Sequence, residues 1–298
     1  MEWQQIFDIA IEMGHKSDIR NIDDPGSYSS GYPDCRIIYG DPGKKIEHLY
    51  IGVDAGVPEM LVVNELKKQG KPIDGIIMHH PTGAGAYTMT GVVELQKCNW
   101  IRNGANPKKT GKVYEEMVRA EEIGLKAGNH LAVENAARLL DMPVICIHTA
   151  IDNVVQDYFE KLAVPDRFTA IDEILEEIKK LPECSMASAN GDGPYLLGES
   201  KSGPGKIMVD MTGGMDPESS IFPILKKAGI NTLIAMHYSQ ENIKAIIKNR
   251  INAIITGHMA SDSIGLNLFC DRLEESGIDI ICGAGLYRYK REKGPGTA

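Results

Sequence analysis

The chain has 298 residues, with 32 Lys and Arg against 41 Asp and Glu, and its formal net charge is -9. The length suffices for one large or two ordinary domains with a sizeable core. A hydrophobic share of 43% with 24% charged residues excludes a largely disordered chain. The acidic balance argues against duplex nucleic acid or an anionic membrane as the main partner, because phosphate binding needs a basic surface.

Neither a membrane span nor a signal peptide is expected from the sequence. No apolar run approaches the roughly 18–20 residues that cross a membrane. The acidic, helically periodic N-terminal segment lacks the basic start and the small-residue cleavage site of a signal peptide. The six cysteines form no C-x-x-C pair, which favours reduced thiols over a disulfide framework. We therefore predict a cytoplasmic protein.

Short apolar runs alternate with helix-period segments along the chain, and this alternation is typical of an α/β fold. The runs are rich in Ile and Val without clean polar alternation, as expected for strands buried on both faces. The predicted strands are His48–Val53, Ile73–Met78, Pro143–Ile147, Lys206–Met211, Asn231–Met236, Asn252–Thr256 and Asp279–Cys282.

Helices are expected between these strands, and all but the first start at a residue whose side chain can accept a hydrogen bond from the free N–H groups of the first turn. The first predicted helix is Pro58–Gln69, and the second is capped by Asn129 and runs to about Leu140. The third starts at Asp166 or Thr169 and ends before Pro182. Two more are capped by Ser239 and by Ser261, and the last of these runs through Glu275.

Two stretches interrupt the alternation. Residues 81–112, rich in Gly, Thr, Asn and Lys, follow a strand end and read as a long insertion. Residues 183–205, rich in Gly, Ser and Pro, read as an irregular connection. We therefore predict an N-terminal α/β domain over 1–182 that contains the insertion, and a C-terminal α/β segment over 206–298.

Five of the eight histidines lie at the C-terminal ends of predicted strands. Two of them, His79 and His80, are adjacent. Each of the other three is followed by a carboxylate four residues later, and these pairs are His148 with Asp152, His237 with Glu241, and His258 with Asp262. Open α/β folds place their sites at this edge of a parallel sheet, so we expect these side chains to meet there.

The residue types indicate which ions such a site would hold. Imidazole nitrogens together with carboxylate oxygens suit zinc, iron, manganese or nickel. His79 and His80 can serve two neighbouring ions once the strand ends, and Pro81 enforces that ending. The alternative for any single histidine is a hydrogen-bonded residue at a strand end, but the joint pattern favours two divalent transition metal ions. Asp54 is expected to cap the next helix or to support a ligand.

One further segment has a possible binding role. Residues 211–217 follow a predicted strand and precede a helix, so their backbone amides either cradle an anion or form a tight turn. Neither Ser nor Cys occurs in a nucleophile-elbow context, which disfavours a Ser/His or Cys/His triad.

At these histidines the sequence resembles the Nif-three-like dinuclear metal-centre proteins, some of which are labelled GTP cyclohydrolase type 2. The resemblance rests on VDAGVPEMLVVNELKKQGKPIDGIIMHHP, NHLAVENAARLLDMPVICIHTAID and GINTLIAMHYSQENIKAI. It implies two interlinked α/β domains with a metal site in the cleft between them, and a homohexamer. The metal ligands that it implies are His79, His80, Asp152, His237 and Glu241, with His148 beside them.

Three features depart from the family pattern. The gap between His80 and His148 is longer than in the family, Met236 stands where the family usually has Gly, and the segment INAIITGHMASD has no assigned counterpart. His258 and Asp262 therefore stay open as extra ligands, substrate contacts or structural residues.

These features predict a metal-dependent hydrolase that acts on an unknown small molecule. Two ions would lower the pKa of a bridging water and polarise a carbonyl, amidine or phosphoryl group. His148 or His258 would act as general acid or base, since imidazole titrates near neutral pH. Cyclohydrolase chemistry is implied by the resemblance alone. The alternative is a non-catalytic metal-binding protein with a regulatory or scaffolding role.

Overall fold

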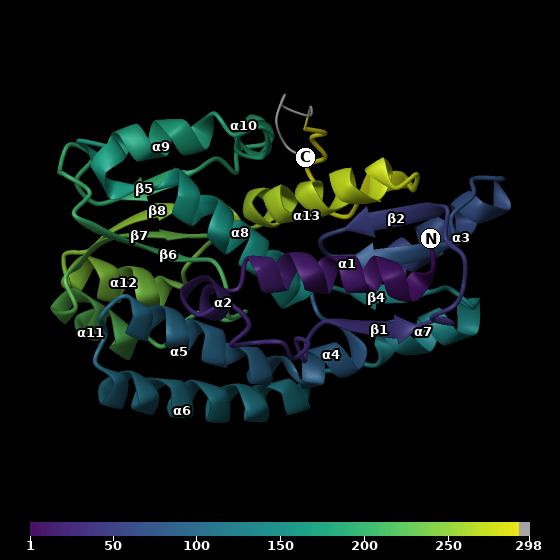
Figure 1. Ribbon diagram of the computed structural model, residues 1–298, viewed down its shortest axis with the longest axis horizontal. Helices are drawn as coiled ribbons and strands as arrows, with labels where there is room; N and C mark the ends of the chain where they lie inside the picture. The colour runs from purple at the N-terminus through teal and green to yellow at the C-terminus, as the bar shows by residue number, and fades with distance from the viewer. Residues whose placement is uncertain (292–298) are drawn as a thin grey trace.

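The computed structural model describes residues 1–291 and contains two mainly parallel β-sheets with helices on both faces (Figure 1). In the first sheet the strand order is β1-β4-β3-β2-β9, and only β1 runs antiparallel to its neighbour within this described range. Its strands are β1 (Arg36–Tyr39), β2 (His48–Gly52), β3 (Gly75–Met78), β4 (Val144–Cys146) and β9 (Asp279–Gly283).

The second sheet has the order β5-β8-β7-β6, with β5 antiparallel at one edge. Its strands are β5 (Tyr195–Leu197), β6 (Lys206–Asp210), β7 (Ile230–Ala235) and β8 (Asn252–Ile255). The predicted α/β class is confirmed. Every predicted strand is present within one to two residues at each end, whereas β1 and β5 were not expected from the sequence.

Helices on the two faces of the first sheet bury alternate side chains of its strands. Ile51 and Ile77 pack on one side against α1 (Trp3–Lys16), α8 (His148–Leu162) and α13 (His258–Glu275). Tyr50 and Ile76 pack on the other side against α3 (Val57–Lys68) and α7 (Ala132–Leu140). This division follows from the two-residue repeat of a strand.

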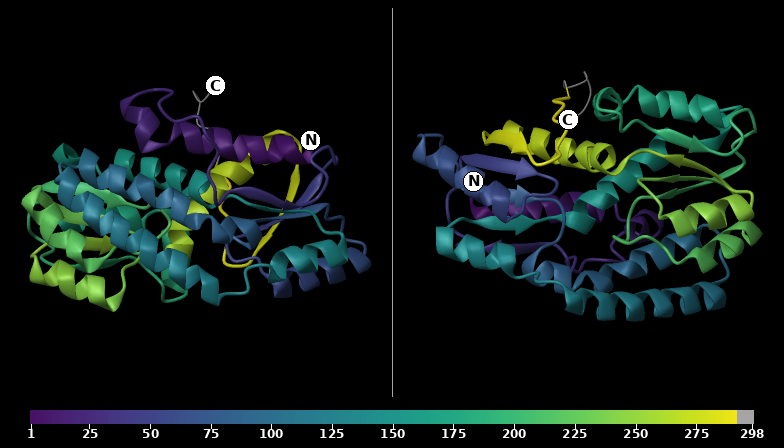
Figure 2. Two further views of the ribbon diagram at one scale, coloured as in Figure 1. Left: turned by 90° about the horizontal axis from the view of Figure 1, so that it is seen from below. Right: turned by 180° about the vertical axis from the view of Figure 1, so that it is seen from behind.

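The second sheet is covered in the same way. Residues of α8, α9 (Ile171–Lys179), α10 (Pro182–Ala189) and α13 form one core with it. The other core holds α5 (Val93–Arg102), α6 (Pro107–Gly124), α11 (Phe222–Lys227) and α12 (Gln240–Lys248). Helices α8 and α13 therefore contribute to the cores of both sheets and join them (Figures 1 and 2). The short elements are α2 (Ile19–Asp23), α4 (Gly83–Tyr87), η1 (Met89–Val92), η2 (Leu125–Ala127), η3 (Pro165–Arg167) and η4 (Ser219–Ile221).

Residues 81–112, expected as a long insertion, are largely helical, whereas residues 183–205 are irregular over more than half of their length. Residues 81–112 form α4, η1, α5 and the start of α6, and Trp100 of α5 is fully buried with Phe222 against the second sheet. Residues 183–205, expected as an irregular connection, hold most of α10 and all of β5. The Gly, Ser and Pro residues that suggested loops thus lie mainly at turns between short elements.

The two sheets are not consecutive parts of the chain. Strand β9 lies in the predicted C-terminal segment, yet it pairs with β2 in the first sheet. Helices α5 and α6 lie in the predicted N-terminal domain, yet they cover the second sheet. Apolar burial on each sheet face, rather than position along the chain, decides these partners. Residues 292–298 of the predicted C-terminal segment lie outside the described residues.

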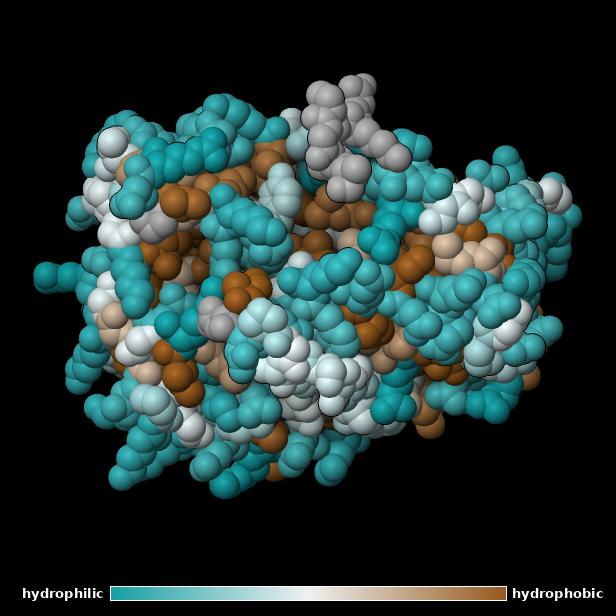
Figure 3. All heavy atoms as spheres, viewed as in Figure 1, coloured by the Kyte–Doolittle hydropathy of each residue, from teal (hydrophilic) through white to brown (hydrophobic). Residues whose placement is uncertain are grey.

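On the face drawn in Figure 3 most side chains are hydrophilic, and hydrophobic ones gather over the strands of the second sheet and beside α13. Over residues 1–291, every helix is either too short or too polar to reach across a bilayer.

Candidate metal centre

His79 and His80 follow β3 at the carboxyl end of the first sheet. The backbone N–H of His79 donates to the carbonyl of Gly52 at 3.1 Å, which extends the pairing with β2 to the end of the strand. The His79 side chain is fully buried, whereas the His80 side chain is partly exposed. The two rings lie 5.0 Å apart at their centroids, so the end of β3 turns both toward one region.

Two helices bring the remaining ligand candidates to the same place. Helix α8 begins at His148, with Asp152 one turn later, and helix α13 begins at His258, with Asp262 one turn later. Residues four apart lie on the same helix face. The expected start of α13 at Ser261 is wrong because the helix begins three residues earlier, after Gly257, whose φ of 90° suits glycine alone.

The Asp262 carboxylate lies at the centre of this arrangement and is fully buried. Its Oδ1 lies 3.5 Å from Nε2 of His79. Its Oδ2 lies 3.4 Å from Nε2 of His80 and 3.4 Å from Nε2 of His258. Asp152 faces His79 from the other side, with Oδ1 at 3.2 Å from Nε2.

These side chains form overlapping groups of ligand atoms, each within 4.8 Å of one another. His79, Asp152 and Asp262 make one group, and His80, His258 and Asp262 make another. A third group contains His79, His80 and His148. The first two groups share Asp262 and can each hold a metal ion.

Several polar atoms of the cluster are buried without a hydrogen-bond partner, namely both ring nitrogens of His79, both oxygens of Asp262 and Oδ1 of Asp152. Leaving a buried polar group unpaired costs about 1–3 kcal/mol, and more for a charged group. A cation between these atoms would satisfy most of them. The nitrogen and carboxylate donors present therefore fit a divalent transition metal.

Two further carboxylates orient histidines of the cluster from outside. Asp54 Oδ1 lies 2.5 Å from Nδ1 of His80, so Nε2 of that ring faces Asp262. Asp34, fully buried, lies 2.8 Å from Nδ1 of His148 and also accepts from the Thr149 hydroxyl at 2.7 Å. Asp34 precedes β1 without any motif, so nothing in the sequence pointed to it.

The charges of the cluster shift its pKa values strongly. Burial alone lowers the pKa of His79, but the carboxylates of Asp262 and Asp152 outweigh it and raise that pKa to about 10. Burial is likewise outweighed at His80, where the nearby carboxylates of Asp262 and Asp54 raise the pKa to about 9. At His258 burial prevails and lowers the pKa. Burial alone raises the pKa of Asp262, but the facing histidines hold it well below its usual range.

The whole architecture is similar to that of solved NIF3 proteins. A NIF3 superfamily protein from Sphaerobacter thermophilus superposes with a TM-score of 0.81 at 23% identity, over 95% of this chain and 98% of that one. The chain has the NIF3 fold. HcgD from Methanocaldococcus jannaschii superposes over 95% of this chain and 97% of its own, with a TM-score of 0.56 at 15% identity. No family model and no curated protein matches the sequence.

The NIF3 fold places the other two predicted ligands differently. His237 lies in the loop before α12, and its ring centroid is 4.7 Å from that of His258, at the rim of the cluster. Glu241 is exposed and accepts from the Ser219 hydroxyl at 2.9 Å. Helix α12 starts at Gln240 under a Ser239 cap, so His237 and Glu241 do not share a helix face. Within residues 1–291, Glu241 is not part of the groups that can hold a metal.

A glycine directly before the histidine, absent at Met236 and His237, occurs at Gly257 and His258, with Asp262 four residues after the histidine. Gly257 joins β8 to α13 with a φ of 90°, whereas Met236 precedes the loop that leads to α12. The spacing from histidine to carboxylate is the same at His237 and Glu241 as at His258 and Asp262, so spacing alone does not distinguish the two segments.

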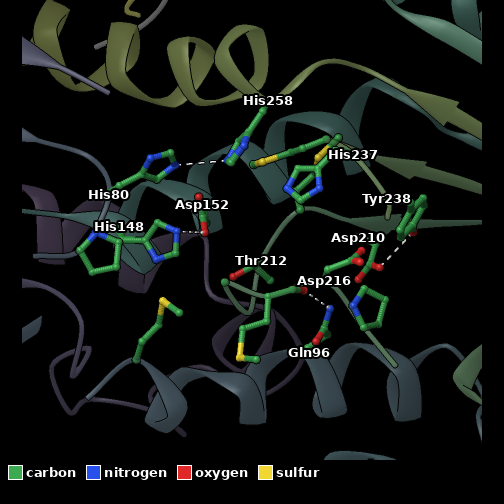
Figure 4. Close-up of a pocket in the computed structure, with 17 residues that line it drawn as sticks. His80, Gln96, His148, Asp152, Asp210, Thr212, Asp216, His237, Tyr238 and His258 are labelled. Carbon is green, nitrogen blue, oxygen red and sulfur yellow. Dashed lines mark hydrogen bonds and ion pairs between the residues drawn. The ribbon is translucent and has the colours of Figure 1, made fainter. Parts of the chain in front are cut away.

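In this NIF3 fold the cluster forms one wall of a cavity of about 270 Å³ between the carboxyl ends of the two sheets. Figure 4 shows His80, His148 and Asp152 on one side of the cavity. The labelled side chains on the opposite side are Asp210, Asp216, Gln96 and Tyr238. The cavity thus provides space for a small molecule next to the candidate metal ligands.

Proposed function

We propose that this chain is a metal-dependent hydrolase with two divalent transition metal ions. One ion would be held by His79, Asp152 and Asp262, and the other by His80, His258 and Asp262. The observation that carries the proposal is the Asp262 carboxylate, which turns one oxygen toward each histidine group while both oxygens lack a hydrogen-bond partner. Zinc, iron, manganese and nickel suit these donors.

Such ions, when bound, lower the pKa of water and polarise a carbonyl, amidine or phosphoryl oxygen or nitrogen. The chain's own residues supply the positioning and the proton transfer. Asp34 holds Nδ1 of His148, and Nε2 of His148 lies 3.4 Å from Oδ2 of Asp152 where both residues line the cavity, so this pair can pass a proton to the leaving group. His258, expected from the sequence as an acid or base, is assigned as a ligand because it shares a group of close ligand atoms with His80 and the Asp262 carboxylate.

The cavity beside the cluster favours an enzyme over a regulatory or scaffolding protein. A non-catalytic metal site has no need for an adjacent space that exposes its ligands, whereas His80, His148, Asp152 and His258 all line this cavity. The homohexamer implied by the family resemblance is part of the proposal, and light scattering on the purified protein tests it.

Metal content of the purified protein tests the ligand set directly. We expect about two equivalents of zinc or manganese per chain after loading and dialysis, and less than half of that in Asp262→Asn, since one carboxylate serves both groups. Glu241→Gln is the matched control, and it should bind as the wild type does. Equal metal content in Asp262→Asn and the wild type would refute the shared ligand, and a loss confined to Glu241→Gln would favour Glu241, the ligand that the family resemblance implies.

Activity is tested separately on a panel of esters, phosphoesters, amides and cyclic amidines. Hydrolysis that requires metal and falls in His148→Ala, while metal content stays at the wild-type level, supports the enzyme. Full metal occupancy without turnover of the panel favours the non-catalytic role.

A further inference from the structure

The wall of the cavity opposite the candidate metal ligands is built from four separate elements. Asp210 ends β6, Asp216 lies in the loop that follows it, Gln96 comes from α5, and Tyr238 follows β7. Gln96 is 2% exposed and Tyr238 is 9% exposed, so both are buried at the base of the cavity. Figure 4 shows these four side chains gathered on one side, away from His80 and His148.

Each of three polar groups in this wall has one atom fixed and one atom free. Asp210 accepts from the Tyr238 hydroxyl at Oδ2 (3.1 Å), and Asp216 accepts from the Ser239 backbone N–H at Oδ2 (3.2 Å). The Gln96 amide donates from Nε2 to the carbonyl of Met215 at 3.0 Å. The remaining atoms are Asp210 Oδ1, Asp216 Oδ1 and Gln96 Oε1, and all three are buried without a hydrogen-bond partner.

The free atoms are all acceptors, and this decides the chemistry of the missing partner. An unpaired buried acceptor is costly, so three in one wall call for a ligand that donates several hydrogen bonds. Burial raises the pKa of Asp210 to about 6, and the neighbouring Asp216 acts in the same direction. A positively charged donor placed here would relieve both the unpaired oxygens and the repulsion between the two carboxylates.

The rest of the lining favours an organic ligand over an anion or a hydrated metal ion. No Lys or Arg lines this cavity in the part of the chain that the structure describes, and the 211–217 loop carries the Asp216 carboxylate and follows Asp210, which disfavours an anion at its amides. The apolar lining residues are Pro81, Met89, Met211, Met215, Met236 and Pro217. Polarisable thioethers adapt well to a flat organic body.

We propose that this wall, which we call the acceptor wall (Gln96, Asp210, Asp216 and Tyr238), binds an N–H-rich group of a small molecule, such as an amidinium, a guanidinium or an amino-substituted heterocycle. As a substrate assignment the proposal rests on the proposed hydrolase function, with the reacting bond held toward the metal cluster. The cavity volume of about 270 Å³ lies near the lower end for small-molecule sites, so the ligand is compact.

Benzamidine is a suitable probe because it is flat, compact and carries a cationic amidine with several N–H donors. Binding is measured by calorimetry on the full chain, loaded with zinc and dialysed, with benzoate as the ligand of opposite chemistry. We expect benzamidine to bind at millimolar concentrations or tighter and benzoate to bind more weakly. Asp210→Asn and Asp216→Asn should each weaken benzamidine by roughly tenfold or more, as expected for loss of a buried charged partner.

The control variant is Glu115→Gln, which removes the same charge from an exposed position on α6 and should change binding less than about twofold. Asp210→Asn keeps the shape of the side chain, and unchanged circular dichroism excludes misfolding as the cause of a loss. Three results would each overturn the acceptor wall. Benzoate could bind as tightly as benzamidine does, Asp210→Asn and Asp216→Asn could both keep full affinity for benzamidine, or Ca²⁺ or Mg²⁺ could displace benzamidine.

Failure of the hydrolase proposal is distinguishable from failure of this one. Asp262→Asn is designed to lose metal but retains the acceptor wall, so benzamidine should bind it within about threefold of the wild type. If Asp262→Asn loses benzamidine binding while Asp210→Asn and Asp216→Asn keep it, the amidine binds at the candidate metal ligands and the acceptor wall is refuted.

Discussion

His258 and Asp262 lie one turn apart at the start of α13, with Nε2 of the histidine 3.4 Å from Oδ2 of the carboxylate. The same relationship recurs at the start of α8, where Nε2 of His148 lies 3.4 Å from Oδ2 of Asp152. Each sheet therefore contributes a helix whose first turn presents one nitrogen and one oxygen donor. Four expectations follow from the contacts of these two helices and of the cavity beside them.

Metal binding is expected to release protons. The pKa values of His79 and His80, about 10 and about 9, mean that both rings are protonated near neutral pH without metal. Because metal binds only the neutral imidazole, loading should release about two protons per chain, and affinity should rise as the pH rises toward these values. Calorimetry in buffers of different ionisation enthalpy measures the number, and a value near zero would contradict it.

Loss of the carboxylate behind His80 is expected to weaken one metal position. Asp54→Asn removes the acceptor at Nδ1 of His80, and loss of such an outer carboxylate typically costs 10–100-fold in metal affinity. Competition with a chelator measures this change. Asp279→Asn is the matched control, since Asp279 lies 3.7 Å from Nε2 of His48, away from the cluster, and is 87% exposed. Equal effects of the two substitutions would rule out an orienting role for Asp54.

Gly257→Ala is expected to disturb both stability and the metal site. An alanine forced to the φ of 90° costs about 1–3 kcal/mol in unfolding free energy, and relief of that strain moves His258. Gly277→Ala is the control because Gly277 also has a positive φ, of 83°, but lies beyond the other end of α13 with open space around it. Urea unfolding should show both variants destabilised, and metal analysis should show reduced content for Gly257→Ala alone.

The free energy of unfolding of the protein is expected to depend on pH through Asp210 of the acceptor wall. Its folded-state pKa of about 6 lies above the ordinary value of 3.8, so its stabilising contribution is complete below about pH 4 and is lost as the pH rises through 6. Asp210→Asn should therefore be more stable than the wild type near pH 8, by at most about 3 kcal/mol at about 1.4 kcal/mol per pKa unit. The advantage should shrink toward pH 5. An advantage that does not change with pH in urea unfolding would contradict this assignment.

The parallel strands could be predicted because each appears as a short apolar run, and all but the partly exposed edge strands are buried on both faces. The strands missed, β1 and β5, are antiparallel edges with partly exposed side chains, and their short sequences RIIY and YLL carry no such continuous signal. Pairing across the chain, such as β9 beside β2, depends on long-range burial that local patterns do not contain.

In the candidate site, too, some features could be predicted from the sequence and others could not. That His79, His80 and Asp152 lie close together could be predicted because they follow strands that end at one sheet edge. The choice between Glu241 and Asp262 could not, since both follow a histidine at the same spacing. It depends on whether the helix begins at the histidine, as α13 does, or after a capped loop, as α12 does.

The chain passes between the two sheets several times, through α5 and α6, then α8, and finally α13 on the way to β9. Enzymes that close like a hinge usually have two lobes joined by a few flexible residues. Here packed helices join the two lobes, and two of them carry candidate ligands in their first turns. We therefore expect ligands to enter through movement of side chains and short loops such as 211–217, with the spacing between the two histidine groups held constant throughout.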